Sequence, residues 1–280
     1  PKQFLPLDGR PVLMHTVQRF ADALPQSRIV VVLPSSHIEY WDKLCRRHGF
    51  AVPHIVCTGG ANRFESVSNG LRHAGEAELI AVHDGVRPLV SREIIERATE
   101  DARTYGAVIP VVRPIDSMRR IDRDGSRIVD RSLYRIVQTP QVFRADILRN
   151  AYARPFDERF TDDASVVEAA GQPVYLCEGS YENIKITTPV DMLTAEALLA
   201  QRQLFKGFFC GCYRIFLLQG QICRIRQSVN LPDKRLDFCF GICVHRQCPF
   251  FRSSVLMFHS DTKHRSFFYR DVPLHRRASV

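Results

Sequence analysis

The chain has 280 residues, of which 45% are hydrophobic and 25% are charged, and these are the proportions of an ordinary globular protein. Its apolar runs, such as residues 29–33, are far too short to cross a bilayer, which excludes a membrane-spanning protein. No secretory signal is visible, so we expect a cytoplasmic protein. Because residue 1 is proline rather than methionine, we also expect the natural beginning to lie upstream.

The net charge of +9 is concentrated near the C-terminus. Residues 206–280 contain thirteen Lys and Arg, four Asp and no Glu, which accounts for the whole net charge and leaves residues 1–205 neutral. Six of the nine cysteines also lie beyond residue 205, and the other three are scattered, as expected of a reduced cytosolic protein. We therefore divide the chain into a domain of residues 1–205 and a tail of residues 206–280.

Apolar strands alternate with amphipathic helices through residues 1–205. A continuous β-branched run such as residues 28–33 is typical of a strand covered on both faces in a parallel sheet. We expect strands or extended segments at residues 28–33, 55–57, 78–82, 107–112, 139–143, 174–177 and 184–187. We expect helices to begin near residues 11, 37, 63, 91, 145, 161 and 188. This alternation predicts an α/β fold with a Rossmann-like, doubly wound and mostly parallel sheet.

Two of the expected helices carry explicit start signals. Thr161 is expected to cap one helix, with Asp162 and Asp163 in its first turn and Gly171 at its end. Residues 188–191 (TPVD) form a capping box with proline at the first helical position of the last helix.

Residues 116–121 and 127–131 flank a turn and predict a β-hairpin that protrudes from the domain. The hairpin is polar on both faces and rich in arginine, so it cannot bury a core by itself. We therefore interpret it as an arm that docks on a second subunit.

The segment with the strongest chemical signal is residues 83–88 (HDGVRP), which directly follows an apolar strand. A carboxylate at the carboxyl end of a central strand lies where open α/β sheets bind ligands. Asp84 could face a metal–phosphate group, a ribose or a substrate hydroxyl, and Arg87 suits a phosphate oxygen. The alternative is that Asp84 caps the turn and pairs with Arg87 on the surface. The Gly59–Gly60 pair before the helix at residue 63 is a weaker signal, since it suits either a bound anion or a tight turn.

Taken together, these segments resemble the 2-C-methyl-D-erythritol 4-phosphate cytidylyltransferase family over residues 1–204. The resemblance rests on seven motifs in order: residues 1–3 (PKQ), 59–66 (GGANRFES), 83–88 (HDGVRP), 130–131 (DR), 139–141 (TPQ), 161–165 (TDDAS) and 183–191 (NIKITTPVD). It implies a nucleotidyltransferase-type sheet and a reaction that joins CMP from CTP to a polyol phosphate, with a divalent cation such as Mg²⁺ accompanying CTP. It also implies a homodimer formed through the arm of residues 116–138.

The resemblance also implies roles for individual residues. Lys2, Arg131 and Lys185 correspond to catalytic cations, with Arg131 reaching into the neighbouring subunit. Nucleotide binding falls to Gly60, Arg63, Ser66 and Asp84. Substrate binding falls to Asp84, Arg87, Thr139 and Thr161. The residue types suit the chemistry, because two anions must approach each other and cations offset their repulsion. No protein-only metal site is expected.

The family pattern also has a strand and a Gly-rich, Arg-containing loop directly before the Pro-Lys-Gln motif, and this sequence starts at Pro1. We therefore expect residues 1–280 alone to be inactive. Two alternatives to the methylerythritol activity remain: a sister enzyme acting on a pentitol phosphate such as ribitol 5-phosphate, and a non-catalytic fragment.

The tail of residues 206–280 matches nothing in the family, including the synthase to which some members are fused. Its cysteines and His245 lack the spacing of a paired zinc site, and its basic and aromatic residues are a weak nucleic-acid signal. We expect neither a zinc site nor a nucleic-acid partner, and we interpret the tail as a segment that is not an evolved domain.

Overall fold

Residues 1–203 are described by the structure, a computed structural model of the chain. The chain divides into a unit of Pro1–Phe209 and a second unit of Cys210–Val280. The expectations for residues 206–280, namely no zinc site, no nucleic-acid contact and no evolved domain, lie outside the described residues and stay predictions.

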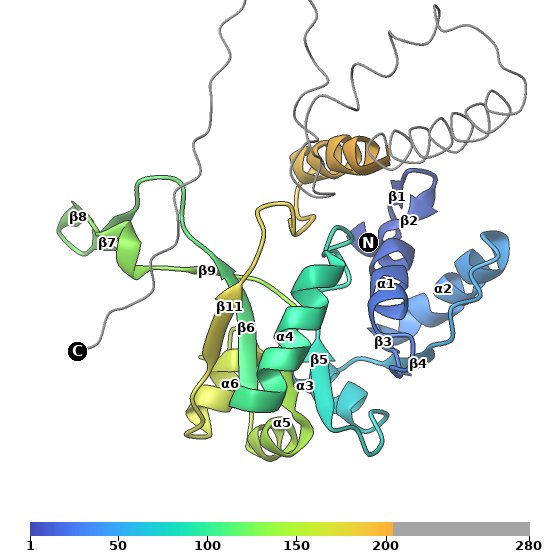
Figure 1. Cartoon of the computed structure of the whole chain (residues 1–280), viewed down its shortest axis with the longest axis horizontal. Helices are drawn as coiled ribbons and strands as arrows, with labels where there is room; N and C mark the ends of the chain where they lie inside the picture. The colour runs from blue at the N-terminus through green and yellow to red at the C-terminus, as the bar shows by residue number, and fades with distance from the viewer. Residues whose placement is uncertain (204–280) are drawn as a thin grey trace, which may run out of the picture. The chain divides into compact units, whose positions relative to one another are not determined.

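A five-stranded sheet forms the centre of the first unit (Figure 1). Its main order is β11 (Tyr175–Glu178), β6 (Ala107–Val112), β10 (Gln141–Arg144) and β5 (Leu79–Val82). β11 pairs with β6 in parallel, whereas β10 runs antiparallel between β6 and β5. The short β9 (Ile136–Val137) extends the far end of β6.

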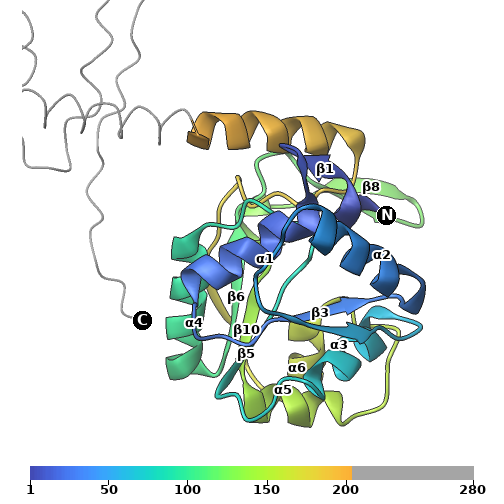
Figure 2. The same cartoon turned by 90° about the vertical axis from the view of Figure 1, so that its right-hand side faces the viewer.

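Helices cover both faces of this sheet, as the alternation of strand side chains requires. Ala107 and Phe143 face α5 (Ala145–Tyr152) and α6 (Asp163–Ala169), with α3 (Arg63–Leu71) beside them. Their sequence neighbours Val108 and Val142 pack on α4 (Arg92–Tyr105). Figure 2 shows α4 on one side of the strands and α3, α5 and α6 on the other. The predicted doubly wound, mostly parallel α/β fold is confirmed.

The N-terminal half adds a separate parallel pair, β3 (Val30–Leu33) and β4 (Ile55–Thr58). Its core joins α1 (Val12–Ala23) and α2 (Ser35–Arg47) around the fully buried Trp41. β3 and β5 are not hydrogen-bonded to each other within the described residues, so the strands form two sheets. Ala81 of β5 is exposed, and the other residues of β5 are only half-buried.

A third layer closes the end of the unit near the N-terminus. The hairpin of β1 (Pro6–Leu7) and β2 (Arg10–Pro11) follows the short helix η1 (Lys2–Phe4). The helix of residues 189–203 buries Ala195 and Leu199 in a cluster with Leu7 and Val12. As predicted, Thr188 caps this helix: its hydroxyl accepts from the Asp191 N–H, and Asp191 Oδ2 accepts from the Thr188 N–H.

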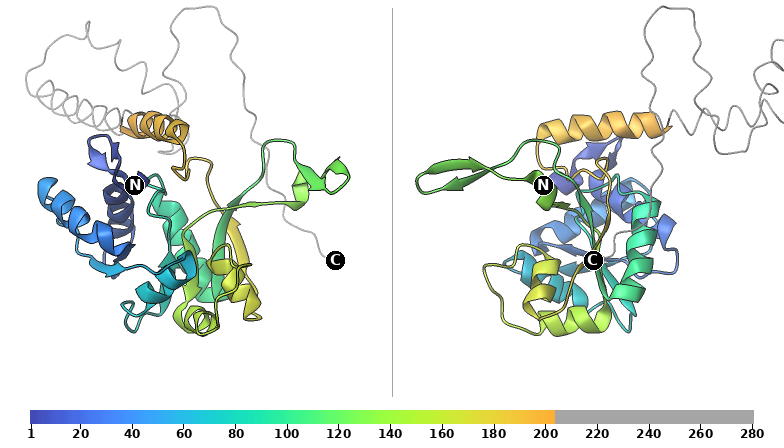
Figure 3. Two further views of the ribbon diagram at one scale, coloured as in Figure 1. Left: turned by 180° about the vertical axis from the view of Figure 1, so that it is seen from behind. Right: turned by 60° about the vertical axis from the view of Figure 1, so that its left-hand side comes forward.

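The predicted arm is present and protrudes from the body (Figures 1 and 3). It consists of the hairpin of β7 (Arg119–Asp122) and β8 (Gly125–Ile128), followed by the short helix η2 (Arg131–Leu133). Nearly every residue of β7 and β8 is exposed, which confirms that the hairpin buries no core of its own.

Two local predictions are wrong. Asp162, rather than Thr161, caps α6, because the Asp162 carboxylate accepts from the Ser165 N–H at 2.9 Å and the Ser165 hydroxyl accepts in return. Residues 184–187 form no strand. The Ile186 N–H bonds to the carbonyl of Val86 and its side chain is buried, so this segment is fixed by a loop contact and not by the hydrogen bonds of a β-sheet.

Within residues 1–203, no helix is long and apolar enough to cross a membrane.

Candidate active site

The turn after β5 buries an ion pair between Asp84 and Arg87. Asp84 Oδ2 accepts from Arg87 Nε at 3.0 Å, and Arg87 Nη1 donates to the Asn183 carbonyl at 2.7 Å. The two side chains are only 17% and 10% exposed, so the pair is not the surface pair of the structural alternative. Arg87 therefore joins the end of β5 to the segment that follows β11.

Lys185 approaches the same carboxylate from that segment. Its Nζ lies 3.2 Å from Asp84 Oδ2, while its side chain stays 47% exposed. Burial disfavours the charged form of Asp84, but the hydrogen bond from Arg87 and the charge of Lys185 lower its pKa below the usual value. The site therefore combines a permanent carboxylate with an ammonium group that solvent and an arriving anion can both reach.

Thr139 and His83 fix the backbone of this turn. Thr139 Oγ1 accepts from the Asp84 N–H at 3.1 Å and lies 3.0 Å from His83 Nδ1. His83 Nε2 lies 3.3 Å from the Arg87 carbonyl, which can only accept, so Nε2 carries the proton and Nδ1 accepts from the Thr139 hydroxyl. Burial lowers the pKa of His83 to about 4, which keeps this neutral form.

This histidine predicts an acid-sensitive fold. The unfolded chain binds a proton at His83 near pH 6.5, and the folded chain binds it only near pH 4, so stability falls as the pH drops through that interval. We expect a loss of about 2–3 kcal/mol between pH 7 and pH 4.5, measured by urea unfolding. His83→Gln, which cannot titrate, should remove that part of the loss. Equal losses in both proteins would contradict the assignment.

A second group of predicted residues lies where β4 leads into α3. The Gly60 N–H donates to Ser66 Oγ at 3.0 Å, and the Ser66 hydroxyl donates to the Asn62 carbonyl at 2.8 Å. A Cβ on Gly60 would lie 2.2 Å from the Cβ of Glu65, so only glycine fits this turn. The side chain of Asn62 caps α3 by accepting from the Glu65 N–H.

The comparisons with known proteins agree on one family. The family model described as 2-C-methyl-D-erythritol 4-phosphate cytidylyltransferase matches residues 1–201. The chain belongs to this cytidylyltransferase family. A relative of that name from Bacteroides fragilis is 50% identical over 199 residues, which cover 71% of this chain and 91% of the relative. Another, from Porphyromonas gingivalis, is 52% identical over 200 residues, which cover 71% of this chain and 89% of the relative.

Solved structures show the same likeness. The crystal structure of the cytidylyltransferase from Thermus thermophilus aligns with a TM-score of 0.59 and 36% identity. The alignment covers 71% of this chain and 93% of that one. The family predicted from the seven ordered motifs is therefore confirmed.

Not every residue implied by the cytidylyltransferase family lies with Asp84. Within residues 1–203, neither Lys2, Arg131 nor Thr161 forms a hydrogen bond or ion pair with Asp84 or Lys185. Lys2 is exposed on η1, and Thr161 is exposed just before α6. Arg131 lies on the arm, where its guanidinium donates to the Ile115 carbonyl.

Asn183 is a residue of the site that the sequence did not single out. It is fully buried, and its Nδ2 donates to the Thr139 carbonyl at 2.9 Å while its own carbonyl holds Arg87. It belongs to the recognised motif of residues 183–191, but a motif alone does not tell a supporting side chain from a binding one. Its Oδ1 is buried without a hydrogen-bond partner in the described part of the chain.

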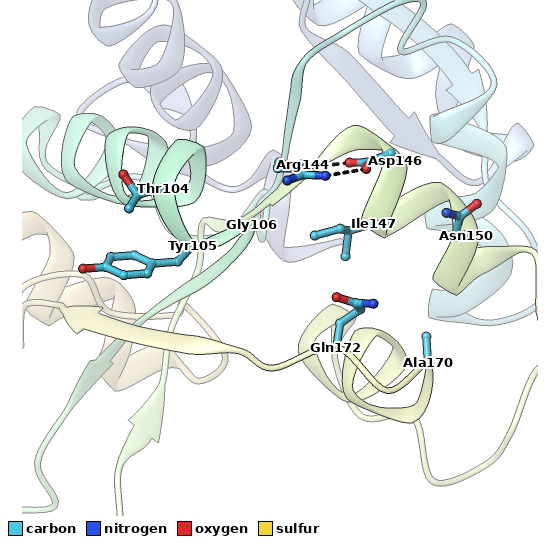
Figure 4. A pocket seen from close by; sticks show the side chains of 9 residues that line it. All are labelled: Thr104, Tyr105, Gly106, Arg144, Asp146, Ile147, Asn150, Ala170 and Gln172. Carbon is cyan, nitrogen blue, oxygen red and sulfur yellow. Dashed lines mark hydrogen bonds and ion pairs between the residues drawn. The ribbon is translucent and has the colours of Figure 1, made fainter.

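A cavity of about 320 Å³ lies elsewhere in this cytidylyltransferase (Figure 4). Tyr105, Gly106, Arg144 and Gln172 line it, and Arg144 is already paired with Asp146. Gly106 precedes β6, and Arg144 pairs with Leu79 at the start of β5. The cavity is therefore at the end of the sheet where β5 and β6 begin, whereas Asp84 follows the other end of β5.

Proposed function

We propose that this chain transfers CMP from CTP to 2-C-methyl-D-erythritol 4-phosphate and releases diphosphate in isoprenoid precursor synthesis. The observation that supports this most directly is the carboxylate of Asp84 held between Arg87 and Lys185 at the end of β5, in a chain of the cytidylyltransferase family. Such transfers are accelerated mainly by positioning and by cations that offset developing charge.

In this reaction an oxygen of the substrate phosphate attacks the α-phosphorus of CTP. A new P–O bond forms, and the bond from the α-phosphorus to the oxygen of the leaving diphosphate breaks. Lys185 is half-exposed and lies against the buried carboxylate of Asp84. It can therefore contact the incoming phosphate while it stays paired with Asp84. Lys2 and Arg131 are exposed cations, and we assign them to the α-phosphate and the substrate phosphate.

Mg²⁺ is the divalent cation that we propose to accompany CTP. The described residues hold no cluster of three His, Cys, Asp or Glu side chains. Mg²⁺ is bound through one or two carboxylates together with phosphate oxygens and waters, so a single carboxylate beside a nucleotide suits it. Asp84 is the carboxylate that would hold it, and the ion would neutralise charge on the triphosphate.

Of the remaining substrate residues, Arg87 and Thr139 contact Asp84 in the turn after β5, and Thr161 lies just before α6. Asp84 is assigned to the methylerythritol hydroxyls, and Thr139 and Thr161 are assigned to the neighbourhood of the substrate phosphate. Arg87 holds the turn through Asn183. A cytoplasmic location is part of the proposal. The three described cysteines are free, and burial raises the pKa of Cys45 and Cys177 to about 11, so neither thiol is reactive.

The test of the function uses an extended chain, defined here as residues 1–280 preceded by an apolar strand and a Gly-rich loop of the family type. Diphosphate release from CTP is measured with 2-C-methyl-D-erythritol 4-phosphate and with ribitol 5-phosphate in parallel. We expect turnover with the first. Turnover with ribitol 5-phosphate alone would move the enzyme to the pentitol class, and turnover with neither would mean a non-catalytic chain.

We also propose that two copies of the chain form a homodimer through residues 116–138. The arm exposes Ile121, Ile128 and Leu133 at 78%, 64% and 80%, which is costly for an isolated arm and suits a surface covered by a partner. In a two-fold dimer, Arg131 would then complete the site of the other subunit, which agrees with its place on η2 of the protruding arm, where its guanidinium donates to the Ile115 carbonyl.

This geometry predicts rescue between two inactive variants of the extended chain. Mixing Arg131→Ala with Lys185→Ala yields mixed dimers in which one site has both cations and the other has neither. With random exchange, we expect about one quarter of the unchanged activity. The diphosphate assay measures it, and native mass spectrometry confirms that the dimers have exchanged. Exchange without rescue would mean that each subunit supplies its own arginine.

A further inference from the structure

The first residue of α6 carries a fully buried carboxylate that no step of the proposed reaction uses. Asp163 is 0% exposed and accepts from Arg63 through both Nη atoms, with Nη1 at 3.1 Å from Oδ1. It also accepts from the Tyr152 hydroxyl at 2.6 Å. A buried carboxylate is tolerated only with such partners, so α3, α5 and α6 are joined at one point.

Apolar packing fixes the same end of α3. The ring of Phe64 stacks on Tyr152 at 4.6 Å between centroids and an interplanar angle of 19°. It also stacks on Phe160, just before α6, at 5.8 Å. Arg63 and Phe64, two successive residues of the first turn of α3, are therefore docked on α5 and α6 by polar and by apolar contacts.

The docked turn continues directly into the Gly59–Gly60 segment. Ser66 in α3 accepts from the Gly60 N–H, and Glu65 in α3 accepts from the Ala61 N–H at 2.8 Å. The backbone of the glycine segment is thus bonded to the helix, and the helix is bonded to Asp163. Displacing Arg63 would shift the N–H groups of this segment.

The ion pair between Arg63 and Asp163 limits how far Arg63 can bind a ligand directly. The bidentate pair with Asp163 occupies both Nη atoms, although 41% of the Arg63 side chain is exposed. Burial and Asp163 raise the pKa of Tyr152, so its hydroxyl keeps its proton and remains a donor. Arg63 is therefore committed to the fold through Asp163 more than it is available to a ligand.

We propose that Asp163 is a positioning residue for the nucleotide, acting through Arg63 on the Gly59–Gly60 segment. This inference rests on the proposed function and on the nucleotide-binding role that the family resemblance gives to Gly60 and Ser66. Asp163 touches no reacting atom. Its loss should weaken CTP binding and leave the bond-forming step and the binding of the polyol phosphate nearly unchanged.

Kinetics of the extended chain test this. Asp163→Asn keeps the shape of the side chain and removes its charge, and we expect the KM for CTP to rise about 10-fold. The kcat and the KM for the polyol phosphate should change by less than about 3-fold. Asp157→Asn is the matched control, because Asp157 also forms a bidentate pair with an arginine, through Nε and Nη2 of the exposed Arg159. An unchanged KM for CTP in folded Asp163→Asn would overturn the inference.

A second readout does not depend on activity. In residues 1–280, Asp163→Asn should speed amide hydrogen exchange at Gly60 and Ala61 by about 5-fold or more, and Asp157→Asn should not. Should Asp163→Asn not fold, Tyr152→Phe and Arg63→Lys replace it, since the first removes one hydroxyl and the second the bidentate fork. Exchange at Gly60 and Ala61 that is unchanged in both would overturn the inference.

The two readouts separate this inference from the proposed function. An unmodified extended chain that makes no product from CTP would contradict the proposed function, while the exchange rates would still decide whether Asp163 fixes the glycine segment.

Discussion

We expect Lys185→Ala to lower the kcat of the extended chain by about 10²–10³-fold, the usual effect of removing one group that stabilises charge in a transition state. The ammonium group of Lys185 is 3.2 Å from Asp84 and half-exposed, so it is placed where the substrate phosphate would arrive. The fold should survive, because Asp84 keeps its hydrogen bond from Arg87. Circular dichroism and the diphosphate assay together measure the two outcomes.

The matched control for this experiment is Lys43→Ala. Lys43 lies on the surface of α2 and is 63% exposed, and within residues 1–203 its only ion pair is with Glu39, so its removal should leave turnover unchanged. A folded Lys185→Ala chain that turns over as fast as Lys43→Ala would contradict the assigned role of Lys185 in phosphate positioning.

We expect the strand and Gly-rich loop, added before Pro1, to raise CTP turnover by at least about 10²-fold over residues 1–280 alone. The physical reason is in the two sheets. β3 and β5 each have one edge without a hydrogen-bonded strand within residues 1–203. β5, which leads to Asp84, is also incompletely buried. A strand there would pair these edges, and the loop after it would offer backbone N–H groups to the triphosphate.

Two further proteins separate the effect of the strand from that of the loop. The same strand followed by a loop of equal length without glycine should raise the midpoint of thermal unfolding but not turnover. If residues 1–280 form cytidine diphosphate product as fast as the extended chain, the role given to this loop is wrong.

The sequence predicts most of this fold because its patterns are local. The β-branched run that becomes β3, the Ser91 cap of α4 and the turn between β7 and β8 each depend on a few neighbouring residues. The sequence predicts the cap of α6 one residue too early, since Thr161 and Asp162 are both good caps and only the bond to Ser165 decides between them.

Local sequence patterns do not predict the contacts that support the site. Asp163 meets Arg63 from a distant part of the chain, and Asn183 is buried against Thr139 by the packing of three segments. Residues 184–187 have the composition of a strand but pair with no strand of the described sheets. Ile186 instead packs in the core near Val86, whose carbonyl accepts from its N–H. Tertiary packing decides these cases.

The position of β10 has a consequence for how the chain is made. β10 lies between β5 and β6 and bonds to both, although it follows them in the sequence. A growing chain that has released β5 and β6 therefore lacks the strand that joins them until residue 144 has emerged from the ribosome. Up to that moment both strands present free edges, and this is the interval in which chaperones would act on the nascent protein.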